Sequence, residues 1–188
     1  MGLREEKKRK TRKNISDIAT QLFIERGYHQ VTTAEIAEKA LVSVPTIFNY
    51  FPSKESLVFD EDEDTEKMLI DSVLNRKKDD TIVETLLKAG LSYINEVKKL
   101  DRKNFEIFMN LVNSTPELSI YAKQMWLRHE RALAGVILKE SKRKLSLAES
   151  GAIARFVLDA YNRAVESEDP ESVLITLFSI LKDGWKEQ

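Results

Sequence analysis

The sequence contains no cysteine and few residues that break helices. Its 188 residues include 6 glycines and 4 prolines. The lack of cysteine excludes disulfides, thiolate metal sites and a cysteine nucleophile, and it is compatible with a reducing cytoplasm. Because glycine and proline are scarce, loops must be few and short, while Leu, Ile, Ala, Lys and Glu recur in long periodic runs. The composition therefore predicts an all-α protein.

Long apolar runs are also absent. One of the longest, VLITLF at 173–178, is far below the roughly 18 residues that a membrane-spanning helix requires. The N-terminal segment MGLREEKKRKTRK is basic and lacks the apolar stretch of a secretory signal. We therefore expect a cytoplasmic protein that has no membrane partner.

Charge is unevenly distributed, although the net charge is only −1. Residues 1–57 contain 10 Lys and Arg against 7 Asp and Glu, and the remainder of the chain contains 20 against 24. Seven of the basic residues lie in REEKKRKTRK, at 4–13. Such a cluster is typical of a segment that binds polyanions, and equally of a solvated tail. The cluster alone does not separate these two interpretations.

Two helices are predicted before residue 41. Apolar residues at three- and four-residue steps predict the first over 10–26, and Gly27 is placed to end it in the left-handed conformation. Thr32 and Glu35 have the spacing of a capping box, which would begin a second helix of about two turns.

A third short helix is predicted between an N-cap residue, Ser43, and residue 51. At 100° per residue, one arc of this helix would be buried and would carry Val44, Ile47, Phe48 and Phe51. The opposite side would present Pro45, Thr46 and Asn49. Two short helices joined by a tight turn and preceded by a third form a helix-turn-helix, whose second helix can enter the major groove.

Residues 11–57 contain LFIERGY, TTAEIAEKA, VSVPTIFNYF and SKESL, in this order. Their order and spacing resemble those of the N-terminal domain of the tetracycline-repressor (TetR) family of bacterial transcription regulators. The family usually has glycine where this chain has Leu41, in the turn between the second and third helices. A leucine there would either adopt the left-handed conformation at some cost or force a different turn.

The resemblance implies two kinds of DNA contact. The residues expected to contact phosphates, and so to fix the register on the duplex, are Thr33, Tyr50 and Lys54. Those expected to contact base edges are Val44, Pro45, Thr46, Phe48 and Asn49. An asparagine can form two hydrogen bonds with adenine, while a proline ring and a threonine methyl can lie against thymine methyls. Alternatively, the Tyr50 ring packs in the small core of this domain, and Lys54 is an ordinary solvated lysine.

The remainder of the chain is predicted to form a larger helical domain at 53–188, which follows the DNA-binding domain at 1–52. The expected ranges of its six helices are 53–76, 80–99, 102–113, 116–142, 146–167 and 170–185. With the first three, they give about nine helices. Asp169 is expected to be the N-cap of the last one.

The last two predicted helices are candidates for a dimer interface. The last helix carries its apolar residues on one stripe, and the helix before it is apolar on two sides. In TetR-like proteins, these helices pair with those of another subunit. The residues expected at such an interface are Leu158, Leu174, Phe178, Leu181 and Trp185. A single monomeric bundle is the alternative.

Aromatic and methionine side chains are candidates for lining an effector pocket. The resemblance implies a cavity for a small molecule, which these side chains would make suitable for an apolar or aromatic compound. Their helical spacing is also that of ordinary core packing. The candidate residues are Tyr93, Phe105, Phe108, Met109, Met125, Trp126, His129, Phe156, Tyr161 and Asn162.

No catalytic or metal-binding motif is complete. The run DEDEDTE at 60–66 lacks the glycine and the closing glutamate of a calcium loop, and HERAL at 129–133 lacks the second histidine of a zinc protease helix. We therefore expect no enzyme, no metal and no cofactor.

The expected function is that of a one-component bacterial transcription regulator, in the family's common mode a repressor. It would bind a palindromic operator in double-stranded DNA as a homodimer, and a small effector would modulate it. One alternative is a helical small-ligand carrier or enzyme whose N-terminal helices are only scaffold. Another is a helical adaptor that binds a protein partner.

Overall fold

The structure, a computed structural model, describes residues 2–98 and 101–184. All regular elements within these residues are helical, which confirms the expected all-α fold. The elements up to residue 58 are α1 (Leu3–Arg26), η1 (Tyr28–Gln30), α2 (Thr33–Lys39), α3 (Val44–Tyr50) and η2 (Glu55–Val58). They are followed by α4 (Asp62–Leu74), α5 (Ile82–Val97), α6 (Arg102–Ser114), α7 (Pro116–Glu140), α8 (Leu147–Glu166) and α9 (Pro170–Asp183). None of these helices combines the length and the apolar character needed to span a bilayer.

The chain divides into two compact units, each of which is discontinuous in sequence. The first consists of Met1–Asp62 and Lys103–Gln124, and the second of Glu63–Arg102 and Met125–Gln188. The first unit therefore continues past residue 52, where the sequence analysis placed the end of the first domain.

Side chains after residue 52 extend the core of the first unit. Leu57 is fully buried there, and its carbonyl accepts a hydrogen bond of 2.7 Å from Ser16 Oγ of α1. Leu111 and Leu118, from α6 and α7, are buried in the same apolar cluster as Ile15 and Phe23 of α1.

The segment 53–76, expected to be one helix, forms η2 and α4 with Phe59 between them in a non-helical conformation. Before this break, Ser56 Oγ donates to Ser53 O at 2.7 Å, and Ser53 Oγ accepts from Ser56 N at 3.3 Å. Such local side-chain hydrogen bonds stabilise a turn in competition with a continuous helix. The prediction of one continuous helix relied on the spacing of apolar residues, which carries no information about these hydrogen bonds.

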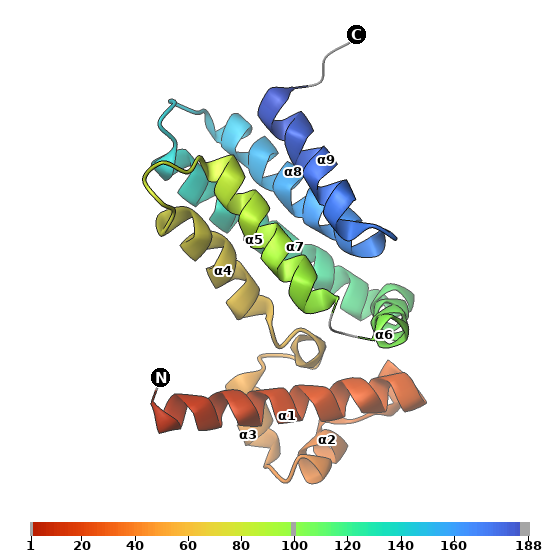
Figure 1. Ribbon diagram of the computed structural model, residues 1–188. Helices are drawn as coiled ribbons and strands as arrows, with labels where there is room; N and C mark the ends of the chain where they lie inside the picture. Colours follow the sequence, from red (N-terminus) through yellow and green to blue (C-terminus); the bar gives the residue numbers. More distant parts are fainter. Residues whose placement is uncertain (1, 99–100, 185–188) are drawn as a thin grey trace. The chain divides into compact units, whose positions relative to one another are not determined.

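In the first unit, α1 lies across α2 and α3 (Figure 1). Helix α1 begins at Leu3, seven residues earlier than expected, so the basic segment at 4–13 belongs to this helix. At the other end, Gly27 has a positive φ of 86° as expected, but its ψ of 143° lies outside the left-handed helical region. Its N–H still caps α1 by donating to Phe23 O at 2.9 Å.

The turn between α2 and α3 requires a left-handed residue, and this residue is Leu41. The N–H of Val42 donates to Ala37 O at 3.0 Å, and the N–H of Leu41 donates to Glu38 O at 3.2 Å. This pair of hydrogen bonds defines a Schellman motif, which places its central residue in the left-handed region. Leu41 adopts a φ of 56°, so the first of the two conformations expected for it is the observed one.

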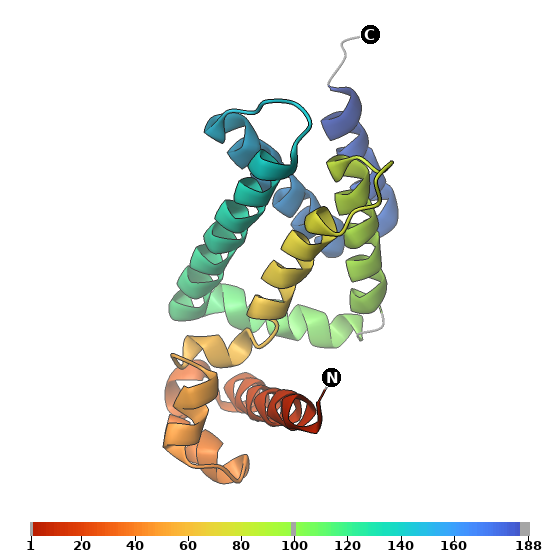
Figure 2. The same ribbon diagram turned by 90° about the vertical axis from the view of Figure 1, so that its left-hand side faces the viewer.

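The second unit is built around α5, α8 and α9, which pack against one another (Figure 2). Gly90 of α5 permits this packing, because a Cβ there would overlap Cε1 of Tyr161 and lie 2.9 Å from Cδ2 of Leu174. The Tyr161 hydroxyl donates to Leu86 O in α5, and its ring stacks on Phe178 with centroids 6.0 Å apart. Burial raises the pKa of this hydroxyl above its ordinary value.

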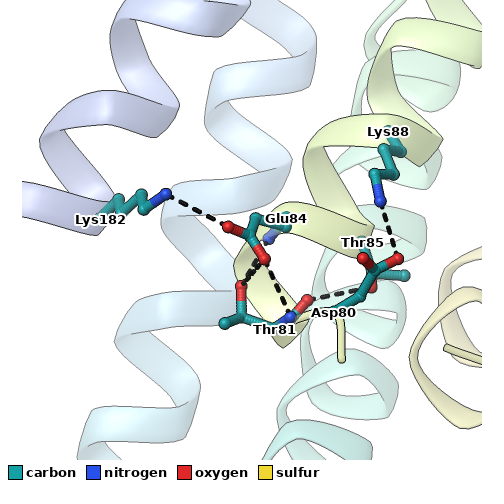
Figure 3. A network of polar contacts seen from close by, with 6 residues as sticks. All are labelled: Asp80, Thr81, Glu84, Thr85, Lys88 and Lys182. Carbon is teal, nitrogen blue, oxygen red and sulfur yellow. Dashed lines mark hydrogen bonds and ion pairs between the residues drawn. The ribbon is translucent and has the colours of Figure 1, made fainter. Parts of the chain in front are cut away.

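A polar network fixes the start of α5 and connects it to α9 (Figure 3). Thr81 and Glu84 form a complete capping box, with Thr81 N donating to Glu84 Oε2 at 3.1 Å and Glu84 N donating to Thr81 Oγ1 at 3.1 Å. Lys182 of α9 donates to the other Glu84 oxygen at 3.2 Å. The hydrogen bonds from Thr81, followed by the bond from Lys182, lower the pKa of Glu84 to about 2. The carboxylate therefore stays ionised across the physiological pH range.

We predict that Leu41→Gly stabilises the protein. The left-handed conformation costs a leucine roughly 1 kcal/mol that glycine avoids, and the Leu41 side chain is 91% exposed and contributes little packing. Relief of this strain should raise the free energy of unfolding, measured by urea denaturation, by about 1 kcal/mol. Part of this gain is offset, because glycine increases the conformational entropy of the unfolded chain. A decrease would show that the leucine side chain stabilises the turn.

Gly90→Ala should have the opposite effect. Alanine has the higher helix propensity by about 1 kcal/mol, but its Cβ would displace Tyr161 and Leu174 from a packed core. We expect a net loss of about 1–3 kcal/mol in urea denaturation. Gly135→Ala in α7 is the matched control, because a Cβ there meets no atom within 4 Å and should stabilise the helix. Equal effects of the two changes would contradict this account of α5.

Candidate nucleic-acid interface

Helix α3 is held at its start by a side-chain cap. Ser43 Oγ accepts from Thr46 N at 3.2 Å and lies 2.7 Å from Thr46 Oγ1, which confirms Ser43 as the N-cap. Pro45 lies in the first turn, where its missing N–H leaves no helical hydrogen bond unmade. Because the Thr46 hydroxyl is engaged with Ser43, its methyl is the group that remains for an apolar contact.

Helix α2 is capped by half of the predicted capping box. Thr32 Oγ1 accepts from Glu35 N at 3.2 Å. The Glu35 carboxylate accepts instead from Arg26 at the end of α1. This ion pair joins α1 to α2 while the N-cap hydrogen bond is retained. Thr33, the first residue of α2, is half-buried.

The inner side of α3 anchors it to the core. Ile47 and Phe51 are fully buried, and Val44 packs against the same cluster while remaining partly exposed. These three residues lie where the helical arc predicted. Phe48, the fourth residue of the predicted arc, is 49% exposed, so the arc was wrong for it. The TetR resemblance, which assigned Phe48 to the DNA-contacting side, agrees with its exposure.

The outer side of α3 carries Pro45, Phe48 and Asn49, all of which are exposed. Thr46 and Tyr50 flank this surface and are half-buried. The sequence VPTIFNY contains no charged side chain. This surface can therefore offer hydrogen bonds from the Asn49 amide and apolar contacts from the Pro45 and Phe48 rings, while any attraction to phosphates must come from neighbouring elements.

An arginine that the sequence analysis missed fixes the end of α3. Arg12 of α1 donates from Nη1 to Tyr50 O at 2.6 Å and from Nε to Asp60 O at 3.1 Å. Its guanidinium also lies 4.5 Å from the centroid of the Phe51 ring. Arg12 precedes the buried Ile15 by three residues and so lies on the inward face of α1, a spacing that could have identified it.

Lys54 is neither free nor simply solvated. Its Nζ donates to Tyr28 O at 2.6 Å and lies 4.2 Å from the centroid of the Tyr28 ring. Burial lowers the pKa of Lys54, against the attraction of Glu55 and Glu117. An ammonium has three donors, so this contact to a carbonyl leaves others for a second acceptor.

Tyr28 and Glu55 form a hydrogen bond beside this lysine. The Tyr28 hydroxyl donates to Glu55 Oε1 at 2.6 Å. Burial, followed by this bond, raises the pKa of Tyr28. Burial opposes ionisation of Glu55, but hydrogen bonds from Tyr28 and Ser53 hold its pKa below the ordinary value. The Glu55 carboxylate therefore remains charged next to Lys54.

The residues expected to line an effector pocket have differing surroundings. Phe108 packs against the core of the first unit, and Tyr161 is buried in the core of the second. His129 is 1% exposed and meets the Trp126 ring edge-on at 5.6 Å. Asn162 is exposed and donates to Glu166 Oε1 at 3.1 Å, so it does not face the core. The other candidates in the second unit are the buried Met125 and the half-buried Tyr93 and Phe156. Those in the first unit are the half-buried Phe105 and Met109.

A hollow of about 280 Å³ lies between α7 and α8, at a different place from these candidates. The residues that line it are Glu130, Arg131, Ala134, Gly135, Leu138, Leu147, Ser150 and Gly151. Within residues 2–98 and 101–184, no cluster of three acidic or histidine side chains could hold a metal ion.

Three of the residues expected at a dimer interface are buried within their own chain. Leu158, Leu174 and Phe178 are 6%, 0% and 1% exposed in the core of the second unit. The apolar stripe of α9 therefore faces α5 and α8 of the same chain, and Leu181 is half-buried against this core. Trp185 lies outside the described residues.

Between residues 172 and 180, the outward side of α9 is uncharged. Ile175 is 51% exposed and Ile180 is 40% exposed. Ser172, Thr176 and Ser179 are exposed beside them. Asp169, the expected N-cap, accepts from Ser172 N at 3.2 Å and so begins this helix.

Comparison with known proteins identifies the family. Residues 15–60 match the model of the bacterial regulatory proteins of the tetR family. An uncharacterised HTH-type transcriptional regulator of Bacillus subtilis, YvkB, is 32% identical over 142 residues, covering 69% of this chain and 71% of YvkB. A putative mycofactocin biosynthesis regulator of Mycobacterium tuberculosis, MftR, is 25% identical over 128 residues, covering 68% of this chain and 64% of MftR.

Solved structures share the fold over almost the whole chain. Thermus thermophilus FadR, a TetR-family repressor solved with lauroyl-CoA, superimposes with a TM-score of 0.59 at 23% identity, covering 94% of this chain and 96% of FadR. Bacillus subtilis FadR, solved with stearoyl-CoA, superimposes with a TM-score of 0.56 at 19% identity, and the match covers 92% of this chain and 98% of that FadR chain. The family match over residues 15–60, the extended identity with YvkB and this shared fold lead to one conclusion: the chain is a transcription regulator of the tetR family.

Proposed function

We propose that this regulator binds a palindromic operator as a homodimer through α3, and that it acts as a repressor under the control of a small apolar or aromatic effector. The observation that carries the proposal is the structure of α3, which is anchored through Ile47 and Phe51 and presents Pro45, Phe48 and Asn49 to solvent. A helix with buried anchors and an exposed polar and apolar face fits the major groove. Its place of action would be the cytoplasm, where chromosomal operators are found.

The proposed DNA contacts divide between positioning and base recognition. Asn49 would pair with adenine, and the Thr46 methyl and Pro45 ring would lie against thymine methyls. Val44 and Phe48 would contact bases beside them. Thr33, Tyr50 and Lys54 would contact phosphates, Lys54 through donors not used by Tyr28 O. The basic α1 would add a sequence-independent attraction.

Control by an effector is proposed from the family and from the apolar composition of the middle helices. A compound that binds more tightly to a conformation with misaligned DNA-binding units would shift the population away from the DNA-competent form. Two relatives of the same fold, both named FadR, were solved with acyl-CoA molecules. Of the candidates in the second unit, Met125, Trp126 and His129 fit a largely apolar wall with one polar group.

The dimer is proposed to form through the outward sides of α8 and α9. Leu174 and Phe178 belong to the core, so Ile175 and Ile180 are the large apolar groups of α9 that a second copy can cover. Serine and threonine between them would allow close helix approach without a desolvated charge. Two-fold pairing of this kind would match two half-sites of a palindrome.

The alternative of a ligand carrier or enzyme with scaffold helices gives no purpose to the exposed α3 surface. The adaptor alternative would need a protein partner on α8 and α9 and no DNA binding. A gel shift against duplexes that flank the chain's own gene separates both from the proposed function. Salt-dependent, sequence-specific retardation supports the regulator, and no retardation of any duplex at low ionic strength would overturn it.

Asn49→Ala should relax base preference. Losing two hydrogen bonds to one adenine in each half-site should reduce discrimination at that position by about 1–3 kcal/mol and leave other positions unchanged. Quantitative binding to single-base variants of the operator measures this profile. Asn95→Ala, an exposed asparagine on α5, is the matched control and should retain the wild-type profile. Identical profiles for wild type and Asn49→Ala would refute the assignment of Asn49.

Ile175→Glu should prevent dimerisation and reduce operator affinity together. A charge in the centre of a covered apolar face would be desolvated without a partner, which costs several kcal/mol. Light scattering gives the mass, and a gel shift gives the affinity. Leu74→Glu, on α4 and 47% exposed, is the matched control and should remain dimeric. A dimeric Ile175→Glu protein would exclude this face of α9 as the interface.

A further inference from the structure

Leu41 combines a strained backbone with an exposed apolar side chain. Its φ of 56° is in the left-handed region, which glycine adopts without steric cost and leucine does not. The side chain is 91% exposed, the highest exposure among the large apolar residues of the described chain. The hydrogen bonds that close its turn come from backbone groups of Leu41 and Val42, so they do not need this side chain. Neither local stability nor packing accounts for a leucine here.

The position of Leu41 suggests what the side chain can do. It lies two residues before the cap Ser43, in the turn that leads into α3. In α3 itself, Pro45 and Phe48 are further exposed apolar groups, and the helix carries no charge. From Leu41 to Phe48, the exposed side chains are therefore apolar or small and uncharged.

We propose that Leu41 is a specificity-determining residue that contacts the 5-methyl group of a thymine in each operator half-site. This inference rests on the proposed function, in which α3 enters the major groove. Base pairs there display hydrogen-bonding groups and, at thymine, a methyl group, so an apolar side chain discriminates for thymine. A leucine that is exposed in the free protein would lose its contact with water only when DNA is bound. The strain in the turn is thus retained because glycine cannot make this contact.

The first experiment removes the methyl group from the DNA. Operator duplexes are selected with wild-type protein from a random pool, and each thymine of one half-site is then replaced singly by deoxyuridine, which lacks only the 5-methyl group. We expect several such thymines, because Pro45 and Thr46 are also proposed to contact thymine methyls, and one of them should depend on Leu41. Its replacement should weaken binding by about fourfold, the effect of one buried methyl group. Each sensitive thymine is then tested with protein variants.

The second experiment removes the leucine and keeps the turn. Asparagine tolerates the left-handed conformation, so Leu41→Asn should be at least as stable as wild type in urea denaturation. It should bind the selected operator roughly fifteenfold more weakly, because each of the two half-sites loses a methyl contact worth about fourfold. At one of the sensitive thymines it should also bind the thymine and deoxyuridine duplexes equally. Leu74→Asn on α4 is the matched control and should retain both the affinity and the fourfold methyl effect.

Two results would overturn the assignment of Leu41. One is wild-type affinity of Leu41→Asn for the selected operator. The other is a weakened Leu41→Asn protein that still distinguishes thymine from deoxyuridine at every sensitive position, because another residue would then contact the methyl group. Failure of the proposed function looks different, since the wild-type protein would select no duplex from the pool.

Discussion

A helix of seven residues is too short to be stable by itself in water, so the proposed DNA-binding surface depends on the contacts that hold α3 at both ends. Ser43 caps its first turn, and Arg12 holds the carbonyl of its last residue. Ile47 and Phe51 fix its inner side in a core shared with α1. The exposed groups of α3 are therefore positioned by its cap, by the Arg12 contact and by its buried side chains.

Local signals in the sequence predicted the caps at which several helices begin. Ser43 and Asp169 could be identified as caps because a cap depends on residues within one turn of the chain. Only half of the capping box predicted from Thr32 and Glu35 forms. The Thr32 side chain caps α2, but the Glu35 carboxylate accepts from a residue outside the helix, Arg26. Phe48 was misplaced because it lies at the edge of the predicted arc, where the helical period cannot separate a buried side chain from an exposed one.

Two features could not be settled from the sequence, for physical reasons. The conformation of Leu41 depends on a balance between its steric cost and the backbone hydrogen bonds of the turn, and both are about 1 kcal/mol. The apolar stripe of α9 predicts burial but not the partner, because a helix of the same chain and a helix of a second copy exclude water equally well. The structure places Leu174 and Phe178 in the core of their own chain and leaves Ile175 and Ile180 outside.

The contact between Arg12 and the Tyr50 carbonyl has an electrostatic consequence. The last carbonyls of a helix form the negative end of its dipole and would repel a nearby phosphate. A guanidinium hydrogen-bonded to one of them neutralises that end of α3. In the proposed complex, DNA that approaches Tyr50 would meet a compensated terminus, and the arginine that completes the fold would also lower an electrostatic barrier to association.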